Sequence, residues 1–156
     1  MQIIQLRCAV AIVAATWVAS LIGCGSSDEW SEKRLKVYKV SGTVLLDGSP
    51  CPDATVTFFS DANPISATGR TNAEGKFQLT TYNDGDGAVE GSQKVTVVKR
   101  EFVEQKTKYD SATESSVAMI PKELLPKKYM TPATSGLTYT VATSGSNDFK
   151  IEITSK

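Results

Sequence analysis

The segment Asn83-Asp-Gly-Asp-Gly-Ala-Val-Glu90 gathers the side chains whose type and spacing best suit metal chemistry. Asp84, Asp86 and Glu90 carry carboxylate oxygens, which hard cations such as Ca²⁺ prefer as ligands. An EF-hand loop that began at Asp84 would need another oxygen ligand where Ala88 stands, and no flanking helices are expected. Asp-Gly pairs also form ordinary turns. We therefore expect a turn with no bound metal or cofactor, and the three carboxylates stay ligand candidates.

An aromatic ring beside polar side chains suits a different ligand, a carbohydrate. Tyr82 precedes Asn83 and Asp84, and Tyr109 or Tyr129 would supply a second ring. Aromatic side chains present a large apolar face and, in tyrosine, a hydroxyl group at its edge. Tyr82 therefore joins the three carboxylates as a ligand candidate.

The chain has no histidine among its 156 residues. This excludes Ser-His-Asp and Cys-His catalysis, a histidine general base and His-ligated zinc. The G-x-S-x-G, S-x-x-K, P-loop and C-x-x-C motifs are also missing. Seventeen acidic residues leave a carboxylate pair open as an acid–base site, although no pair stands out. We expect a protein that is not an enzyme, with an uncharacterised hydrolase as an alternative.

The charge balance bears on partners. Lys and Arg together number 17, as do Asp and Glu, so the formal net charge at pH 7 is zero. Nucleic-acid binding draws on an excess of positive charge at the contact surface. We therefore expect no nucleic acid as a partner.

Residues 1–23 are predicted to be a secretory signal peptide. Arg7 is the only charged residue before Asp28, and Ala9–Ile22 is apolar except for two hydroxyl residues. Fourteen helical residues span about 21 Å, short of the roughly 30 Å hydrocarbon core of a bilayer. A positive start, a short apolar stretch and small residues at the exit are typical of exported proteins. A short signal anchor is the alternative.

The exit of this segment, Leu21-Ile22-Gly23-Cys24, resembles the lipobox of bacterial lipoproteins. The resemblance implies cleavage after Gly23 and acylation of Cys24, so the protein would face the periplasm or cell surface as a membrane-anchored lipoprotein. Two or three acyl chains hold stably, because each buried methylene contributes about 0.8 kcal/mol. Residues 24–36 are polar and suit a tether. An accidental cysteine beside an ordinary cleavage site is the alternative.

Cysteine use agrees with this interpretation. Cys8 would leave with the signal peptide and lipid would occupy Cys24, so Cys51 would be the one remaining thiol. A single cysteine cannot form an internal disulfide. We expect Cys51 to be a small buried hydrophobic residue, with an intermolecular or redox thiol as the alternative.

From residue 37 onward the sequence predicts β-strands. Apolar residues recur at every second position with polar residues between them, which is typical of half-buried strands. Turn signals at 47–50, 72–75 and 145–148 separate the runs, and the last is expected to form a hairpin. Short strands at this spacing favour an antiparallel sandwich or barrel. The alternating positions are Tyr38, Val40, Val44, Leu46, Val56, Phe58, Phe77, Leu79, Val95, Val97, Leu137, Tyr139, Val141, Phe149, Ile151 and Ile153.

Residues 100–136 interrupt this rhythm, with many charged, serine and threonine residues and three prolines. Residues 120–126 are predicted to form one helical turn, with Pro121 at its start. Three interpretations stay open: protection of a sheet edge, a binding loop, or disorder. The apolar residues available to cover an edge or end are Phe102, Tyr109, Ile120, Leu124, Leu125 and Tyr129.

The run from Val40 to Phe58 has the form V-x-G-x-V, then D-G-x-P, then A-x-V-x-F, and Thr71 to Phe77 has the form T-x-x-x-G-x-F. These motifs resemble the carboxypeptidase regulatory-like (transthyretin-like) domain. The resemblance implies an all-β, seven-stranded Greek-key antiparallel β-sandwich over residues 37–156. The run from Ile120 to Phe149 is similar to the tail of small lipoproteins of planctomycete-type bacteria.

The chain also departs from that family. Cys51 stands where an apolar residue is usual and Asp53 where glycine is common, both within a turn. The enzymatic relatives, the hydroxyisourate hydrolases, use active-site histidines and a Tyr-Arg-Gly-Ser terminus, which this chain lacks. These relatives are therefore no guide to its function.

The sequence predicts a non-catalytic, lipid-anchored β-sandwich protein of the cell envelope with a structural or adhesive role. Its partners would be the membrane, through the acyl chains on Cys24, and an envelope protein or polysaccharide. The alternative is a polysaccharide- or peptide-binding module that uses residues 100–136.

Overall fold

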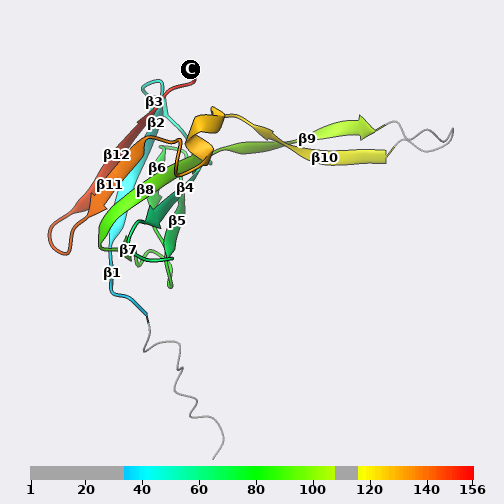
Figure 1. Cartoon of the computed structure of the whole chain (residues 1–156). Coiled ribbons are helices and arrows are strands. Elements are labelled where there is room, and N and C mark those ends of the chain that lie inside the picture. Colours follow the sequence, from blue (N-terminus) through cyan, green and yellow to red (C-terminus); the bar gives the residue numbers. More distant parts are fainter. Residues whose placement is uncertain (1–33, 108–115) are drawn as a thin grey trace, which may run out of the picture. The chain divides into compact units, whose positions relative to one another are not determined.

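Short β-strands make up almost all of the regular structure in the computed structural model, which describes residues 34–107 and 116–156 (Figure 1). Residues 35–156 form one compact unit. The strands are β1 Val37–Tyr38, β2 Val40–Leu46, β3 Ser49–Pro50, β4 Thr55–Ser60, β5 Ser66–Arg70, β6 Lys76–Gln78, β7 Ala88–Val89, β8 Gly91–Val98, β9 Arg100–Thr107, β10 Ser116–Glu123, β11 Leu137–Val141 and β12 Asn147–Ile153. A 3₁₀ turn, η2, covers Lys127–Met130.

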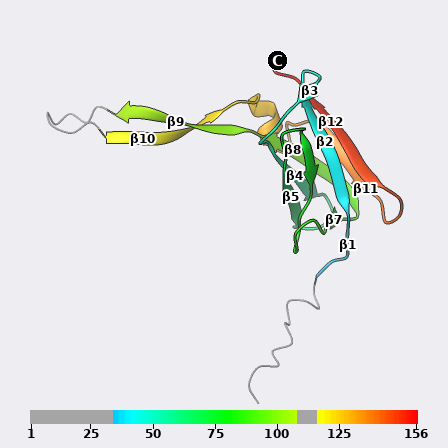
Figure 2. The same cartoon turned by 180° about the vertical axis from the view of Figure 1, so that it is seen from behind.

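Two sheets pack on one another in a sandwich-like arrangement (Figures 1 and 2). The first has the strand order β11-β8-β4-β5, and every neighbouring pair in it is antiparallel. The second has the order β12-β2-β3, with β6 also paired to β2. Strand β12 runs parallel to β2, so this sheet departs from the antiparallel arrangement that the sequence predicted.

The connection between β11 and β12 is a second departure. The turn signal at 145–148 predicted a hairpin, but β11 pairs with β8 and β12 pairs with β2, so residues 142–146 cross from one sheet to the other. Asn147 closes this crossing: its side-chain Oδ1 accepts the Ala142 N–H (2.9 Å) and its Nδ2 donates to the Ala142 carbonyl oxygen (3.0 Å). Alternation reveals which face of a strand is buried but not which strand lies beside it.

The turn at 47–50 forms as its sequence predicts. Asp47 and Gly48 both have positive φ angles, 50° and 83°, which is the backbone of a type I′ hairpin turn. Leu46 and Ser49 face each other across it. The tight link between β2 and β3 therefore depends on a glycine that adopts this conformation without strain.

The alternating apolar residues form the core, as predicted. Phe58 of β4 is fully buried. The centre of its ring lies 6.4 Å from the ring centre of Phe77, 6.1 Å from that of Tyr139 and 5.8 Å from that of Phe149. These rings come from both sheets, so one aromatic cluster holds the two layers together. The predicted core positions that are only partly buried but pack against the cluster are Tyr38, Leu46, Leu137, Tyr139 and Phe149.

Residues 100–136 take a form that the sequence did not predict. Strands β9 and β10 form an antiparallel hairpin that pairs with no other described strand and leaves the sheets beyond β8 (Figure 2). The helical turn lies at 127–130 instead of 120–126, because Pro121 is accommodated in β10, an edge strand that pairs only with β9. Leu125 and Tyr129 are buried in the core, whereas Phe102, Ile120 and Leu124 are exposed.

Cys51 is buried with 2% exposure, as predicted. Burial raises the pKa of its thiol, and the charge of Lys99 opposes this shift. A thiol in this state is largely protonated and shielded from reagents. Within the described residues, no helix is long and apolar enough to cross a membrane.

Candidate functional site

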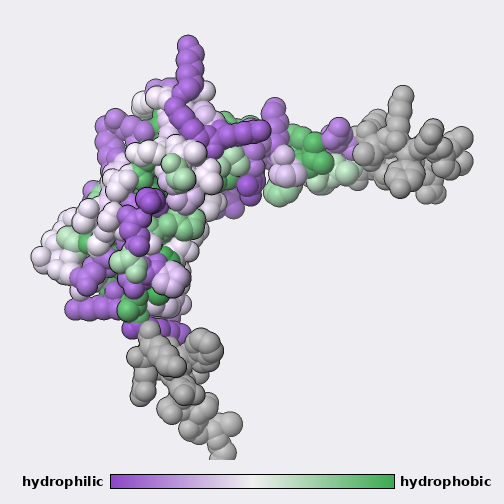
Figure 3. Space-filling view, viewed as in Figure 1, coloured by the Kyte–Doolittle hydropathy of each residue, from purple (hydrophilic) through white to green (hydrophobic). Residues whose placement is uncertain are grey.

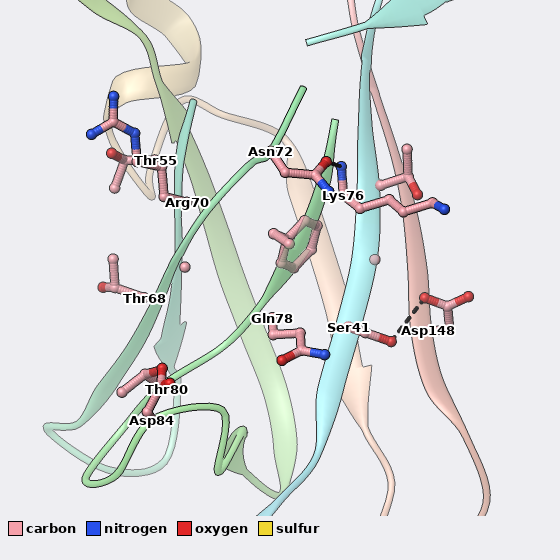
Figure 4. Close-up of a pocket in the computed structure, with 14 residues that line it drawn as sticks. Ser41, Thr55, Thr68, Arg70, Asn72, Lys76, Gln78, Thr80, Asp84 and Asp148 are labelled. Atoms are coloured by element: carbon pink, nitrogen blue, oxygen red, sulfur yellow. Dashed lines mark hydrogen bonds between the residues drawn. The ribbon is translucent and has the colours of Figure 1, made fainter. Parts of the chain in front are cut away.

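An open polar groove of about 760 Å³ crosses β5, β6, β2 and β12 on the outer face of the sandwich (Figure 4). Its lining is a consequence of strand alternation, because each strand turns its apolar residues inward and its polar residues outward. The groove is lined by Ser41, Gly42, Thr43, Thr55, Thr68, Gly69, Arg70, Asn72, Lys76, Phe77, Gln78, Thr80, Asp84 and Asp148.

The strand register sets these polar side chains in rows across the sheets. Ser41 pairs with Gln78 of β6 on one side and with Asp148 of β12 on the other. Ser41 Oγ donates to Asp148 Oδ1 at 3.0 Å, and Figure 4 shows this bond as a dashed line. In the same way Thr68 of β5 pairs with Thr80. Hydroxyl, amide and carboxylate groups are therefore held at fixed spacings by rigid backbone.

Two glycines allow the strands beneath the groove to approach closely. A Cβ atom on Gly69 of β5 would collide with the carbonyl oxygen of Gln78, and one on Gly42 of β2 would collide with the carbonyl oxygen of Phe149. The Phe77 ring, which is 3% exposed, packs against the Gly42 backbone from the interior. The floor is therefore made of backbone and a buried ring, and the polar ends of the side chains form the surface.

The charged side chains of the groove are balanced. Arg70 forms an ion pair with Asp53, with 3.1 Å between Nη2 and Oδ1. Lys76 forms another with Glu74, with 3.5 Å between Nζ and Oε2. Both pairs are largely exposed, so they contribute little to stability. They do limit the excess of positive charge that the groove presents to a ligand.

Two neighbouring hollows extend the groove at either end. One shares Ser41 and Gln78 with it and continues toward the 145–147 turn. The other shares Arg70 and Thr55 with it and reaches Phe102 at the base of the β9–β10 hairpin. Together with the groove they form a track of adjoining hollows between the hairpin and the connection between β11 and β12.

The three carboxylates that were ligand candidates lie in separate places. Asp84 lines the groove, and Glu90 is exposed between β7 and β8. Asp86 instead organises its own loop: Oδ1 accepts the Thr81 N–H (2.7 Å), and Oδ2 accepts the N–H groups of Tyr82 (3.0 Å) and Asn83 (2.8 Å). Among the described residues, no group of three or more His, Cys, Asp or Glu side chains is placed to hold a metal ion.

The tyrosines considered as candidates for sugar binding differ in exposure. Tyr82 is half-buried, and its hydroxyl oxygen accepts the Leu35 N–H at 3.1 Å. Tyr129 is 6% exposed and its hydroxyl oxygen accepts the Thr154 N–H at 3.1 Å, so its ring packs in the core and is not presented to a sugar. Its burial ties η2 to the segment that follows β12. Tyr109 and the predicted lipidation site Cys24 lie outside the described residues.

Replacement of Asp86 by Asn tests its role in the loop. Partial burial would raise the pKa of Asp86, but the backbone N–H donors of Thr81, Asn83 and Tyr82 hold it below its ordinary value. Asp86→Asn should therefore lower the free energy of unfolding at pH 7 by about 1–2 kcal/mol, because an amide cannot accept all three bonds as a carboxylate does.

The pH dependence gives this prediction a second readout. A carboxyl group whose pKa is lower in the folded state stabilises the fold at pH values above its ordinary pKa of about 3.9. This stabilisation is lost as the pH falls through the lowered pKa. The difference in the free energy of unfolding between wild type and Asp86→Asn, measured by urea unfolding, should therefore become smaller as the pH falls through that range. Asp84→Asn is the matched control in the same loop, and an equal loss there would contradict the assignment.

Sequence reasoning missed the groove as a site. Ser41, Thr68 and Gln78 each occupy an outward position in a short strand, where polar residues are expected without any function. Their convergence depends on the pairing of β6 with β2 and on the contact of β5 with the segment after β6. The one signal in the sequence was the glycine in each of β2 and β5, where a side chain would be expected in a strand.

Comparisons with known proteins add little. No family model and no curated protein matches the sequence. Among solved structures, a 9R-lipoxygenase from Cyanothece PCC8801 is similar with a TM-score of 0.37 and 13% sequence identity. The similarity covers 76% of this chain and 16% of the lipoxygenase chain. At this TM-score the likeness supports no inference about fold or function.

Proposed function

We propose that this protein is a non-catalytic β-sandwich of the cell envelope, held at a membrane by acyl chains on Cys24 and acting in adhesion to an envelope protein. The sandwich-like arrangement and the V-x-G-x-V, D-G-x-P and T-x-x-x-G-x-F motifs support a Greek-key β-sandwich of the carboxypeptidase regulatory-like type, although its strands number more than the seven predicted and β12 runs parallel to β2. The apolar stretch and the Leu21–Cys24 motif support export and anchoring.

The observation that carries the adhesive role is the apolar surface of the β9–β10 hairpin. Met119 is 58% exposed, Phe102 63% and Ile120 38%. Figure 3 shows apolar patches on this hairpin between hydrophilic ones. Exposed clusters of large apolar side chains are costly in water and commonly mark interaction surfaces.

Both faces of the hairpin contribute to this surface. Phe102 faces Pro121 across the strands, and Met119, two residues away on β10, lies on the same face. Ile120 faces Val103 and lies on the opposite face. A single-sided sheet covering the sandwich would be apolar on one face only. Apolar residues on both faces therefore favour insertion between surfaces of a partner.

Polar substitutions in β10 test this proposal. The double variant Met119→Ser and Ile120→Ser should lower the retention of the protein on purified envelope fragments by about tenfold, because it removes most of two large apolar contacts. The binding is measured by co-sedimentation of the full chain with increasing amounts of envelope. Thermal unfolding of each variant checks that the fold is intact.

A matched control separates adhesion from general loss of surface hydrophobicity. Leu35 and Leu124 are both 39% exposed and lie outside the hairpin strands. Their double replacement by Ser should leave retention within twofold of wild type. Equal retention of the Met119→Ser, Ile120→Ser variant and wild type would refute adhesion through the hairpin.

A further inference from the structure

We propose that the polar groove across β5, β6, β2 and β12 binds an extended, uncharged polysaccharide. This site lies on the sandwich, whereas the hairpin surface lies on β9 and β10; Phe102 borders both, and the two proposals are otherwise tested on different residues. Three features of the groove identify the class of ligand: the chemistry of its side chains, the state of its backbone groups and its charge.

The side chains match a polyhydroxyl ligand. The Ser41 hydroxyl donates to Asp148 Oδ1, so its oxygen is left to accept a further hydrogen bond. Thr80 Oγ1 accepts the Gly85 N–H at 3.0 Å and keeps its O–H as a donor, and Thr68 Oγ1 lies 3.3 Å from Thr57 Oγ1. Gln78 adds an amide with a separate donor and acceptor. A sugar hydroxyl is both donor and acceptor, so it can complement either kind of group. The second oxygen of the Asp148 carboxylate adds an acceptor.

The backbone beneath the groove argues against a peptide ligand that adds a strand. Strand β2 is paired with β12 on one edge and with β6 and β3 on the other. Strand β5 is paired with β4, and on its other edge Thr68 exchanges both backbone hydrogen bonds with Thr80 at 2.9 Å. β-Augmentation requires a free strand edge. Strands β2 and β5 therefore offer a peptide no free edge at the centre of the groove, and recognition over these strands depends on side chains.

The charge of the groove argues against a polyanion. Arg70 and Lys76 each have a carboxylate partner, Asp53 and Glu74. Asp148 adds negative charge on the side of the groove away from Arg70, where Figure 4 shows it beside Ser41. A polyuronate or sulfated polymer would have to displace these ion pairs and approach carboxylates, which costs affinity. An uncharged chain meets no such barrier.

An exposed ring stands at one end of the track. Phe102 borders the hollow that shares Thr55 and Arg70 with the groove. An aromatic face beside hydrogen-bonding groups suits the apolar face of a hexose ring. A chain that runs from Phe102 over Arg70 and Thr68 to Gln78 and Ser41 would contact each of them with successive residues.

The test measures binding of end-labelled, uncharged hexasaccharides of glucose, mannose and xylose to the full chain by fluorescence anisotropy. Hexagalacturonate and a Ser/Thr-rich hexapeptide serve as the comparison ligands. The groove variant combines Ser41→Ala, Thr68→Val and Gln78→Met, which remove hydrogen-bonding groups and preserve the size of two of the three side chains. Phe102 is left unchanged because it borders both proposed surfaces. The control replaces two exposed threonines of β11, Thr138→Val and Thr140→Val.

We expect at least one uncharged hexasaccharide to bind, and the groove variant to weaken that binding by about tenfold or more through the loss of three polar contacts. The β11 variant should stay within twofold of wild type, and all variants should keep the unfolding midpoint of wild type within a few degrees. Three results would overturn the proposal: no uncharged hexasaccharide binding tighter than about 10 mM, tighter binding of hexagalacturonate or the peptide, or equal affinity of the groove variant and wild type.

Discussion

Replacement of Phe58 by Ala should lower the free energy of unfolding by about 3–5 kcal/mol. Phe58 has no exposed surface, and its ring contacts the rings of Phe77, Tyr139 and Phe149. The substitution would open a cavity at the junction of the two sheets, which a rigid backbone cannot fill. Because single domains are stable by only about 5–15 kcal/mol, this loss is a large share of the total.

Phe59 provides a control at the adjacent position. It is the next residue of β4, turns to the opposite face and is only partly buried. Phe59→Ala should therefore cost about 1 kcal/mol or less. Both variants are compared by urea unfolding, with the slope of the transition checked against wild type. If the two substitutions cost the same, the assignment of the inner face of β4 would be wrong.

Replacement of Cys24 by Ala should abolish acylation and leave the precursor uncleaved after Gly23. The lipobox resemblance implies that lipid attaches to this thiol, so the alanine variant has no acceptor for it. Labelling with palmitate and the intact mass of the protein purified from its native membranes measure both effects. The wild-type mass should equal that of residues 24–156 plus acyl chains.

Cys51→Ala is the matched control for this experiment. Cys51 is buried within the sandwich, so its replacement should leave palmitate labelling unchanged. Normal labelling of Cys24→Ala would contradict the lipoprotein assignment, and an unmodified full-length mass of the wild-type protein would exclude the anchor.

Much of the fold could be predicted from residue patterns, because burial is a local property of a strand. Alternation at Val56 and Phe58, or at Ile151 and Ile153, indicates the inner face directly, and each of these residues is buried. The turn at Asp47-Gly48 could also be predicted, because its positive φ angles favour an Asp-Gly pair.

The partners of each strand could not be predicted in this way. The parallel pairing of β2 with β12 joins segments that are more than a hundred positions apart, and neither segment alone specifies it. The β9–β10 hairpin was missed for a related reason. Pro121 indicated the start of a helical turn, but it lies in β10, which pairs with β9 and with no other described strand. A proline is tolerated in such an edge strand, and the local sequence does not show that the strand is at an edge.

The candidate site was the least predictable feature. Clustered carboxylates drew attention to residues 83–90, where Asp86 proved to bind backbone N–H groups of its own loop. The polar groove instead collects side chains from five strands and their connections, and only the register brings Gln78, Ser41 and Asp148 into one row. Sequence patterns identify sites built from one segment far better than sites assembled across a sheet.

The pairing of β2 with β12 also bears on the timing of folding. Strand β2 is among the first strands to be synthesised, yet one of its edges stays open until β12 follows, since Ser41 and its partner Asp148 are 107 positions apart. Closing so long a loop is entropically costly, and folds that depend on such contacts form slowly. The second sheet is therefore completed only after β12 has been made, so the sandwich-like arrangement closes late and slow folding is expected.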